Sequence, residues 1–128
     1  MSILVLETYS PTQHQRVVSP EELDEVFHGL DRAEPATLSC EDHDNDRSLI
    51  VSFDGDYAFA EYLYDNTSYV LDVSDKEETV GICIDGIDVI ERLKSNVVSR
   101  QQGLELVRRA LADMAGAFSS FHWVPDNG

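Results

Sequence analysis

The stretch NVVSRQQGLELVRRALADMAGAFSSFHW, from Asn96 to Trp123, decides the fold of this 128-residue chain. Ser99 can cap a helix, and Gly116 is expected to end it. The apolar residues between them recur at helical spacing and share one face: Leu104, Val107, Ala110, Leu111 and Met114. The alternation from Ser119 to Val124 predicts a short final strand that contains the single tryptophan.

A second, shorter helix is predicted near the N-terminus. Ser19 and Glu22 form a capping-box pattern around Pro20, which suits a first helical turn. The apolar residues that follow make one stripe: Leu23, Val26, Phe27 and Leu30. This helix is expected to end near Asp31, and the polar residues 12–18 before it predict a connecting segment.

The rest of the chain predicts short strands joined by tight turns. The expected strands are Ile3–Tyr9, Thr37–Glu41, Ser48–Phe53, Tyr57–Tyr64, Ser68–Val73, Val80–Ile84 and Ile87–Leu93. Asp54-Gly55 and Asp85-Gly86 are hairpin turn signals. We therefore predict an α+β fold: a single antiparallel β-meander sheet of about six to eight strands, with an N-terminal and a C-terminal helix packed on one face. Residues 1–128 are expected to form one acidic domain.

The strand Tyr57–Tyr64 has two faces of different character. One carries Tyr57, Phe59, Glu61 and Leu63, and the other carries Ala58, Ala60, Tyr62 and Tyr64. Small residues would let a helix pack closely, but Phe59 and Leu63 would make an equally good core. The pattern leaves open which face is buried.

The charge distribution is uneven along the chain. Lys and Arg number 9 against 25 Asp and Glu, so the net charge is -16. Residues 41–91 carry -13 of it, whereas residues 92–128 carry +2. Such acidity disfavours nucleic acid and anionic membranes as partners and favours a basic protein. The N-terminus lacks the basic region of a signal peptide and no apolar run could span a bilayer, so a cytoplasmic protein is expected.

No motif in the sequence indicates catalysis or a cofactor. Asp42, Asp44 and Asp46 align with the first ligands of an EF-hand loop, but Arg47 replaces its glycine and Phe53 its bidentate acid. Cys40 and His43 have metal-like spacing without the further ligands that zinc needs. Serine-nucleophile and phosphate-binding motifs are absent from the sequence. We therefore expect a protein that is not an enzyme and that needs no metal or cofactor.

The segment from Val80 to Trp123 resembles the first-numbered immunity-protein family of bacterial polymorphic-toxin systems. The matching positions are Val97, Val98, Ser99, Leu104, Val107, Leu111 and Trp123. The chain departs from the family pattern at Ala110-Leu111, where a phenylalanine–leucine pair is expected, and at 114–117, where glycine and proline should precede the last strand. The resemblance implies a small acidic α+β protein that neutralises a cognate toxin domain, often a nucleic-acid deaminase or nuclease.

The leading hypothesis is an immunity protein that covers the basic cleft of such a toxin with an acidic surface. The expected contact residues are Asp54, Asp56, Glu61, Tyr62, Tyr64, Asp65, Asp72, Asp75, Glu77 and Glu78. An alternative is an acidic dimeric secretion chaperone that holds an effector protein. A third is an enzyme or small-ligand protein whose pocket has no sequence signature. The sequence leaves open the oligomeric state, the chemistry of the toxin and which sheet face forms the interface.

Overall fold

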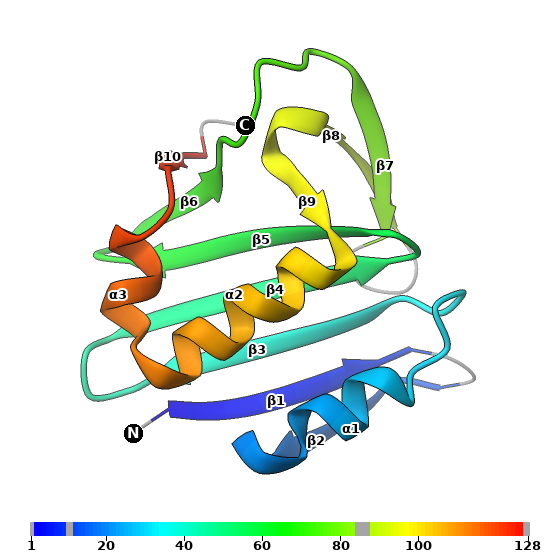
Figure 1. Cartoon of the computed structure of the whole chain (residues 1–128), viewed down its shortest axis with the longest axis vertical. Helices are drawn as coiled ribbons and strands as arrows, with labels where there is room; N and C mark the ends of the chain where they lie inside the picture. Colours follow the sequence, from blue (N-terminus) through cyan, green and yellow to red (C-terminus); the bar gives the residue numbers. More distant parts are fainter. Residues whose placement is uncertain (1, 10–11, 84–87, 127–128) are drawn as a thin grey trace.

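Helices cover one face of a large antiparallel sheet in the computed structural model, which describes residues 2–9, 12–83 and 88–126 (Figure 1). The strands are β1 (Ser2–Thr8), β2 (His14–Val18), β3 (Ala36–Asp42), β4 (Arg47–Asp54), β5 (Tyr57–Tyr64), β6 (Thr67–Leu71), β7 (Thr79–Cys83), β8 (Val89–Leu93), β9 (Val97–Ser99) and β10 (Trp123–Pro125). The helices are α1 (Leu23–His28), α2 (Arg100–Ala112) and α3 (Met114–Ser119), with single 3-10 turns at Pro20–Glu22 and Lys94–Asn96.

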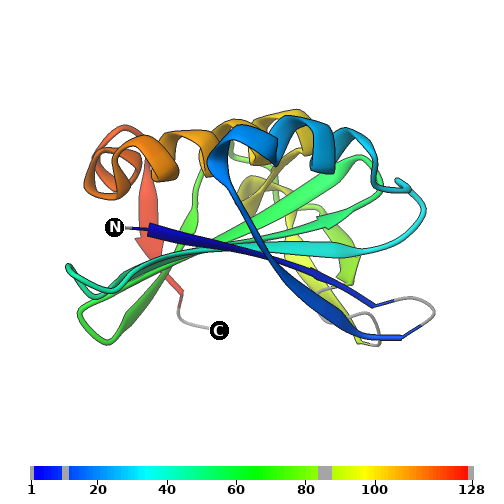
Figure 2. The same cartoon turned by 90° about the horizontal axis from the view of Figure 1, so that it is seen from below.

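The main sheet has the strand order β10-β6-β5-β4-β3-β1-β2, and β9 pairs with the beginning of β5. All its described pairings are antiparallel. Figure 2 shows the helices on one side of this sheet. The predicted α+β fold, with N-terminal and C-terminal helices on one face of an antiparallel sheet, is confirmed. The strands β7 and β8 form a separate two-stranded sheet.

The segment 12–18 was wrongly predicted as a connection, because His14–Val18 forms the edge strand β2 beside β1. Only Val18 of this strand is buried, and the other four residues are exposed. An edge strand with polar residues on both faces lacks the apolar alternation by which strands are recognised, and its polarity protects the open edge.

The first helix begins as the sequence predicts. The Glu22 carboxylate accepts a hydrogen bond from the Ser19 backbone N–H at 3.0 Å, as in a capping box. Leu23 and Phe27 are buried against the sheet. The regular helix ends at His28, slightly before the expected position near Asp31.

The second helix begins at the predicted cap but ends differently. The Gln102 N–H donates to Ser99 Oγ at 3.1 Å, and Gln102 Oε1 accepts from the Ser99 N–H at 3.0 Å. Asp113 then takes an extended conformation, with φ -160° and ψ 99°, and separates α2 from α3. Gly116 lies inside α3 and does not end the helix. A Cβ atom there would lie 2.4 Å from Asp113 Oδ2, so the Asp113 side chain occupies its place.

The C-terminal strand is shorter than predicted. The residues from Ser119 to His122 complete α3 and a turn, and only Trp123–Pro125 pairs with β6. The expected strand at 87–93 is present from Val89, whereas the hairpin turn predicted at Asp85-Gly86 lies outside the described residues. No helix in the described part of the chain is long and apolar enough to span a membrane.

Both faces of β5 pack against other parts of the protein, although the sequence left open which of the two is buried. Ala58, Ala60 and Tyr62 face the helices and belong to the larger core. Phe59 faces the other way and packs in a second apolar cluster with Ile82 of β7. The paired strands β7 and β8 therefore cover one part of the sheet face that the helices leave open.

Helix α2 lies very close to the sheet at Gly103. A Cβ atom at this position would lie 2.6 Å from the Ala58 Cβ and 2.9 Å from Phe53 Cε1. Real Cβ atoms do not approach other atoms so closely, so only glycine fits without movement of α2 or β5. The two small residues set the separation of the two layers.

We predict that Gly103→Ala destabilises the protein. In an exposed helix this change usually stabilises by about 0.5–1 kcal/mol, but overpacking here should outweigh that gain and cost about 1–3 kcal/mol. Urea denaturation measures the difference, and Gln101→Ala, at an exposed position of α2, is the control with an expected effect within about 0.5 kcal/mol. A Gly103→Ala protein as stable as wild type would contradict the close contact.

The buried thiol of Cys40 makes stability depend on pH. Burial raises the pKa of Cys40 from its ordinary 9.0 to about 11. The folded state therefore holds this proton more tightly, and the resulting stabilisation is complete below pH 9 and is lost as the pH rises through 11. Between pH 8 and pH 10.5 the wild type should lose about 1–2 kcal/mol more of its unfolding free energy than Cys40→Ala. Equal losses in the two proteins would show that the thiol titrates normally.

Candidate protein-binding surface

Two acidic turns lie side by side at one end of the sheet. The turn 43–46 joins β3 to β4, and the turn Asp65-Asn66 joins β5 to β6. Because β4 and β5 are neighbours, with Arg47 paired opposite Tyr64, both turns project from the same end (Figures 1 and 2). We call this region the acidic turn surface and define it by Asp44, Asp46, Ser48, Leu63, Tyr64, Asp65, Asn66 and Ser68.

The backbone of these turns explains why aspartate and asparagine occupy them. Asp65 and Asn66 have φ values of 53° and 59°, which is the pattern of a two-residue type I′ hairpin turn. Asp46 also has a positive φ, of 52°. Asparagine and aspartate tolerate the left-handed region better than other residues with a side chain. The turn chemistry thus places exposed carboxylates at Asp46 and Asp65.

A hollow of about 360 Å³ lies between the two turns. Ser48, Leu63 and Ser68 line it and are cross-strand neighbours on β4, β5 and β6, on the face away from the helices. Asp46 and Asp65 stand beside it. Leu63 is 37% exposed, so an apolar contact is available between the carboxylates.

Two contacts of Arg47 position Tyr64, the aromatic residue of this surface. The guanidinium of Arg47 lies 4.0 Å from the ring centroid of Tyr64, a cation–π contact. Arg47 Nη1 also donates to the hydroxyl of Tyr62 at 3.3 Å, and this hydrogen bond raises the pKa of Arg47. The Tyr64 ring also lies 6.2 Å from that of Phe118 in α3, so it faces the helix side, opposite to Leu63, and is 36% exposed there.

Tyr62 is a core residue and is excluded from the contact surface. It is fully buried, its hydroxyl donates to the Met114 carbonyl at 3.0 Å, and its ring stacks on Phe118 with centroids 4.7 Å apart. Trp123 lies on another side of the ring, at 5.5 Å. Alternation along β5 points Tyr62 toward the helices, so it joins α3 to the sheet.

Three of the ten predicted contact residues come together at the acidic turn surface. Tyr64 and Asp65 belong to it, and Glu61 is adjacent, because its carboxylate accepts a hydrogen bond from Ser68 Oγ at 3.4 Å. Glu61 is half-buried and faces the side away from the helices.

Asp54 and Asp56 lie at the opposite end of β5, roughly 23 Å from Tyr64 along the strand. Asp54 has a structural contact, since its Oδ2 accepts from the Cys83 N–H at 2.9 Å. Asp56 is exposed and forms an ion pair with Arg32. These two residues therefore cannot share one small contact area with Asp65.

The other four predicted residues belong to the segment that follows β6. Asp72 is half-buried, with its Oδ2 3.8 Å from His122 Nε2. Asp75 and Glu77 are exposed, and Glu78 forms an ion pair with Lys94 at 3.1 Å. This segment leaves β6 at the end away from the Asp65-Asn66 turn, so it does not extend the acidic turn surface.

The prediction from sequence missed Asp44, Asp46 and Leu63. In the sequence, Asp44 and Asp46 stand out only as a partial match to a calcium-binding loop. Within the described residues, no group of three histidine, cysteine, aspartate or glutamate side chains is placed to hold a metal ion. The predicted strand order could have identified these residues. Alternate hairpin turns of an antiparallel meander project from the same end of the sheet, so the turns 43–46 and 65–66 must lie near one another.

The turn conformation can be tested by substitution. Asn66→Ala places an ordinary side chain at φ 59° and should lower the unfolding free energy by about 1–2 kcal/mol. Asn66→Gly, which accepts this φ freely, should leave stability nearly unchanged. Thermal or urea unfolding of the two proteins measures the difference, and equal stabilities would contradict the type I′ turn.

The chain was compared with protein-family models and with curated proteins, and neither comparison found a match. The resemblance of residues 80–123 to immunity proteins remains a prediction from the sequence. The structure assigns roles to the positions that carry it: Val97, Val98, Leu104, Val107 and Trp123 are buried, Leu111 packs at the edge of the core, and Ser99 caps α2. They are scaffold residues, so any recognition of a partner depends on other parts of the chain.

Proposed function

We propose that this chain is an immunity-type inhibitor that binds a basic toxin domain through the acidic turn surface. The observation that carries the proposal is the pairing of two acidic turns around a hollow that exposes Leu63, with the Tyr64 ring exposed at the same end of the sheet on its helix side. Carboxylates that flank an apolar and aromatic centre are suited to bind a basic protein, because charge steers the encounter and the centre supplies burial.

The charge of the chain supports this choice of partner. Asp46 and Asp65 form no ion pair within the described residues, so their charges are available to a partner. The wider segment 41–91 carries -13 of the total -16, and such a field accelerates association with a positively charged surface. A cleft that binds nucleic-acid phosphates is positively charged, and carboxylates on a rigid scaffold can take the place of phosphates in it. The proposed target is therefore a nucleic-acid deaminase or nuclease.

The aromatic and aliphatic groups of the surface would supply most of the affinity. Tyrosine is favoured at the centre of interfaces, where its truncation often costs about 2 kcal/mol or more. Arg47 restricts the Tyr64 ring before binding, which lowers the entropy lost on association. The proposed site of action is the cytoplasm, where the buried thiols Cys40 and Cys83 would stay reduced.

The first test is binding to the toxin domain encoded by a neighbouring gene. Co-expression of that domain with this chain should restore growth of the host, and the two proteins should co-purify as a complex in which the toxin is folded. A partner held in an extended, unfolded form would instead support the secretion chaperone. Failure to bind the products of both flanking genes would contradict the proposal.

A triple variant tests the electrostatic contribution to binding. It combines Asp44→Asn, Asp46→Asn and Asp65→Asn. Asparagine keeps the positive-φ turns, so this triple variant removes three charges without changing the scaffold. We expect its association rate at low salt to fall about tenfold or more, with a weaker dependence on ionic strength. The matched control is Glu21→Gln, Glu25→Gln and Glu34→Gln, which removes three exposed charges on the helix side. An equal loss in both variants would attribute the effect to net charge alone.

Tyr64→Ala tests the aromatic contribution at the same end of the sheet. Its expected cost in binding free energy is about 2 kcal/mol, seen mainly as faster dissociation. Tyr57 is the control, because it lies at the other end of β5 and is 39% exposed, against 36% for Tyr64. Tyr57→Ala should leave the affinity unchanged, and the reverse result would move the interface to the opposite end of the sheet.

A further inference from the structure

Arg100 is a buried cation that forms no ion pair with a carboxylate in the part of the chain that the structure describes. It is the first residue of α2, only 8% exposed, and its guanidinium lies 4.9 Å from the ring centroid of Phe27 and 5.6 Å from that of Phe53. Its Nη1 donates to the Gly55 carbonyl at 3.1 Å. Its Nη2 is buried and has no hydrogen-bond partner within the described residues.

This arrangement is unusual in a chain that has 25 acidic residues. Buried arginines are normally paired with a carboxylate, because a desolvated charge without a partner costs free energy. Burial lowers the pKa of the Arg100 guanidinium, and the nearby charge of Arg32 acts in the same direction. The carboxylate of Asp56 opposes these two effects only in part. Both effects mean that a negative charge placed beside Arg100 would be strongly favoured.

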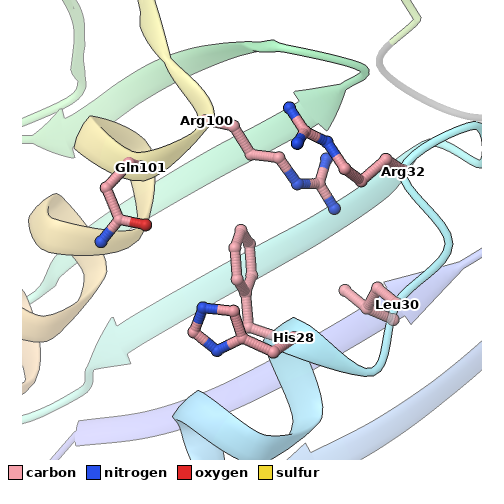
Figure 3. A pocket seen from close by; sticks show the side chains of 6 residues that line it. His28, Leu30, Arg32, Arg100 and Gln101 are labelled. Atoms are coloured by element: carbon pink, nitrogen blue, oxygen red, sulfur yellow. The ribbon is translucent and has the colours of Figure 1, made fainter.

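A pocket of about 190 Å³ opens beside this guanidinium. Phe27, His28, Leu30, Arg32, Arg100 and Gln101 line it (Figure 3). The side chains of Arg100 and Arg32 point toward one another, from α2 and from the connection after α1, while His28 and Leu30 form the other side. Arg32 forms an ion pair with Asp56, whose charge also acts on Arg100, but the Arg100 guanidinium itself makes no ion pair within the described residues.

We propose that this pocket binds a single carboxylate group, with Arg100 as its main ligand and Arg32 as the second. A guanidinium offers planar, paired donors that match a carboxylate, and the rings and Leu30 would contact the carbon atoms attached to it. The volume corresponds to about six water molecules, which suits a carboxylate with a few carbon atoms.

The site is independent of the proposed inhibitor function. Arg100 contacts Gly55 in the β4–β5 turn, which is at the opposite end of the sheet from the acidic turn surface. The carboxylate could belong to a free small acid or to an acidic side chain or C-terminus of a polypeptide. Both present the same group to Arg100, and the experiment below distinguishes them.

The test titrates the full chain with sodium acetate, with sodium chloride at equal ionic strength as the reference. The side-chain Nε–Hε signal of Arg100 is followed by NMR. We expect a saturable change with acetate that chloride does not produce. The backbone amide of Gln101, which lines the pocket, should respond to acetate in the wild type and no longer respond in Arg100→Met, which lacks the arginine signal. A signal that responds equally to acetate and chloride would overturn the proposal.

Two exposed residues keep the test decisive if Arg100→Met folds poorly. Arg32→Gln removes the second cation and should weaken acetate binding about threefold or more. Asp56→Asn removes the carboxylate that competes for Arg32 and should strengthen binding by a similar factor. Their side chains are 63% and 80% exposed, so neither change should alter the fold. Acetate affinities identical to wild type in both variants would count against the site.

Two blocked peptides that compete with acetate show whether the carboxylate belongs to a free acid or to a polypeptide. Acetyl-Gly-Gly presents a C-terminal carboxylate, and acetyl-Gly-Glu-amide presents a side-chain carboxylate. Binding of either peptide at least tenfold more tightly than acetate would support a polypeptide ligand. Binding of acetate alone would support a free small acid, and absence of binding by all three would refute the proposal.

Discussion

The contact between Gly103 and Ala58 is the constraint on which the rest of the structure depends. It lets α2 lie against β4 and β5 at a separation that any larger side chain would increase. Leu104, Leu106 and Val107 are then buried in the space beside it, where α2 meets the sheet. Dispersion forces fall steeply with distance, so a small increase in the separation would weaken many contacts at once.

The other end of the helical layer is held by Tyr62. Its ring fills the space between β5 and α3, and its hydroxyl satisfies the Met114 carbonyl at the start of α3. Asp113 makes this possible, because its extended backbone ends α2 and lets α3 turn toward the tyrosine. Arg47 then joins this buried tyrosine to the exposed Tyr64. Tyr64 of the proposed contact surface is therefore linked to the core through Arg47 and Tyr62.

Local signals explain which features could be predicted from the sequence. The caps at Ser19 and Ser99, the buried stripe of α2 and the β4–β5 hairpin all depend on residues close together in the chain, and each is present. The turn of this hairpin is Gly55-Asp56, one position after the predicted Asp54-Gly55. The edge strand β2 was missed because it buries a single residue, Val18.

Features set by distant parts of the chain could not be predicted in this way. Gly116 is a packing residue because of where the Asp113 side chain lies, and Tyr62 is core because α3 covers it. The candidate surface was found only in part for the same reason. Its acids come from two turns about 20 residues apart, and the order of the strands brings them together.

The positive-φ turns have a consequence for how such a surface could diverge between related proteins. At Asp46, Asp65 and Asn66, the backbone accepts aspartate, asparagine or glycine with little change in conformational energy. Single substitutions among these residues would alter the local charge by one unit and leave the strands in place. Binding preference could therefore drift in small steps while the packing of α2 stays under strict selection. The fold separates the positions that are free to vary from those that must remain small.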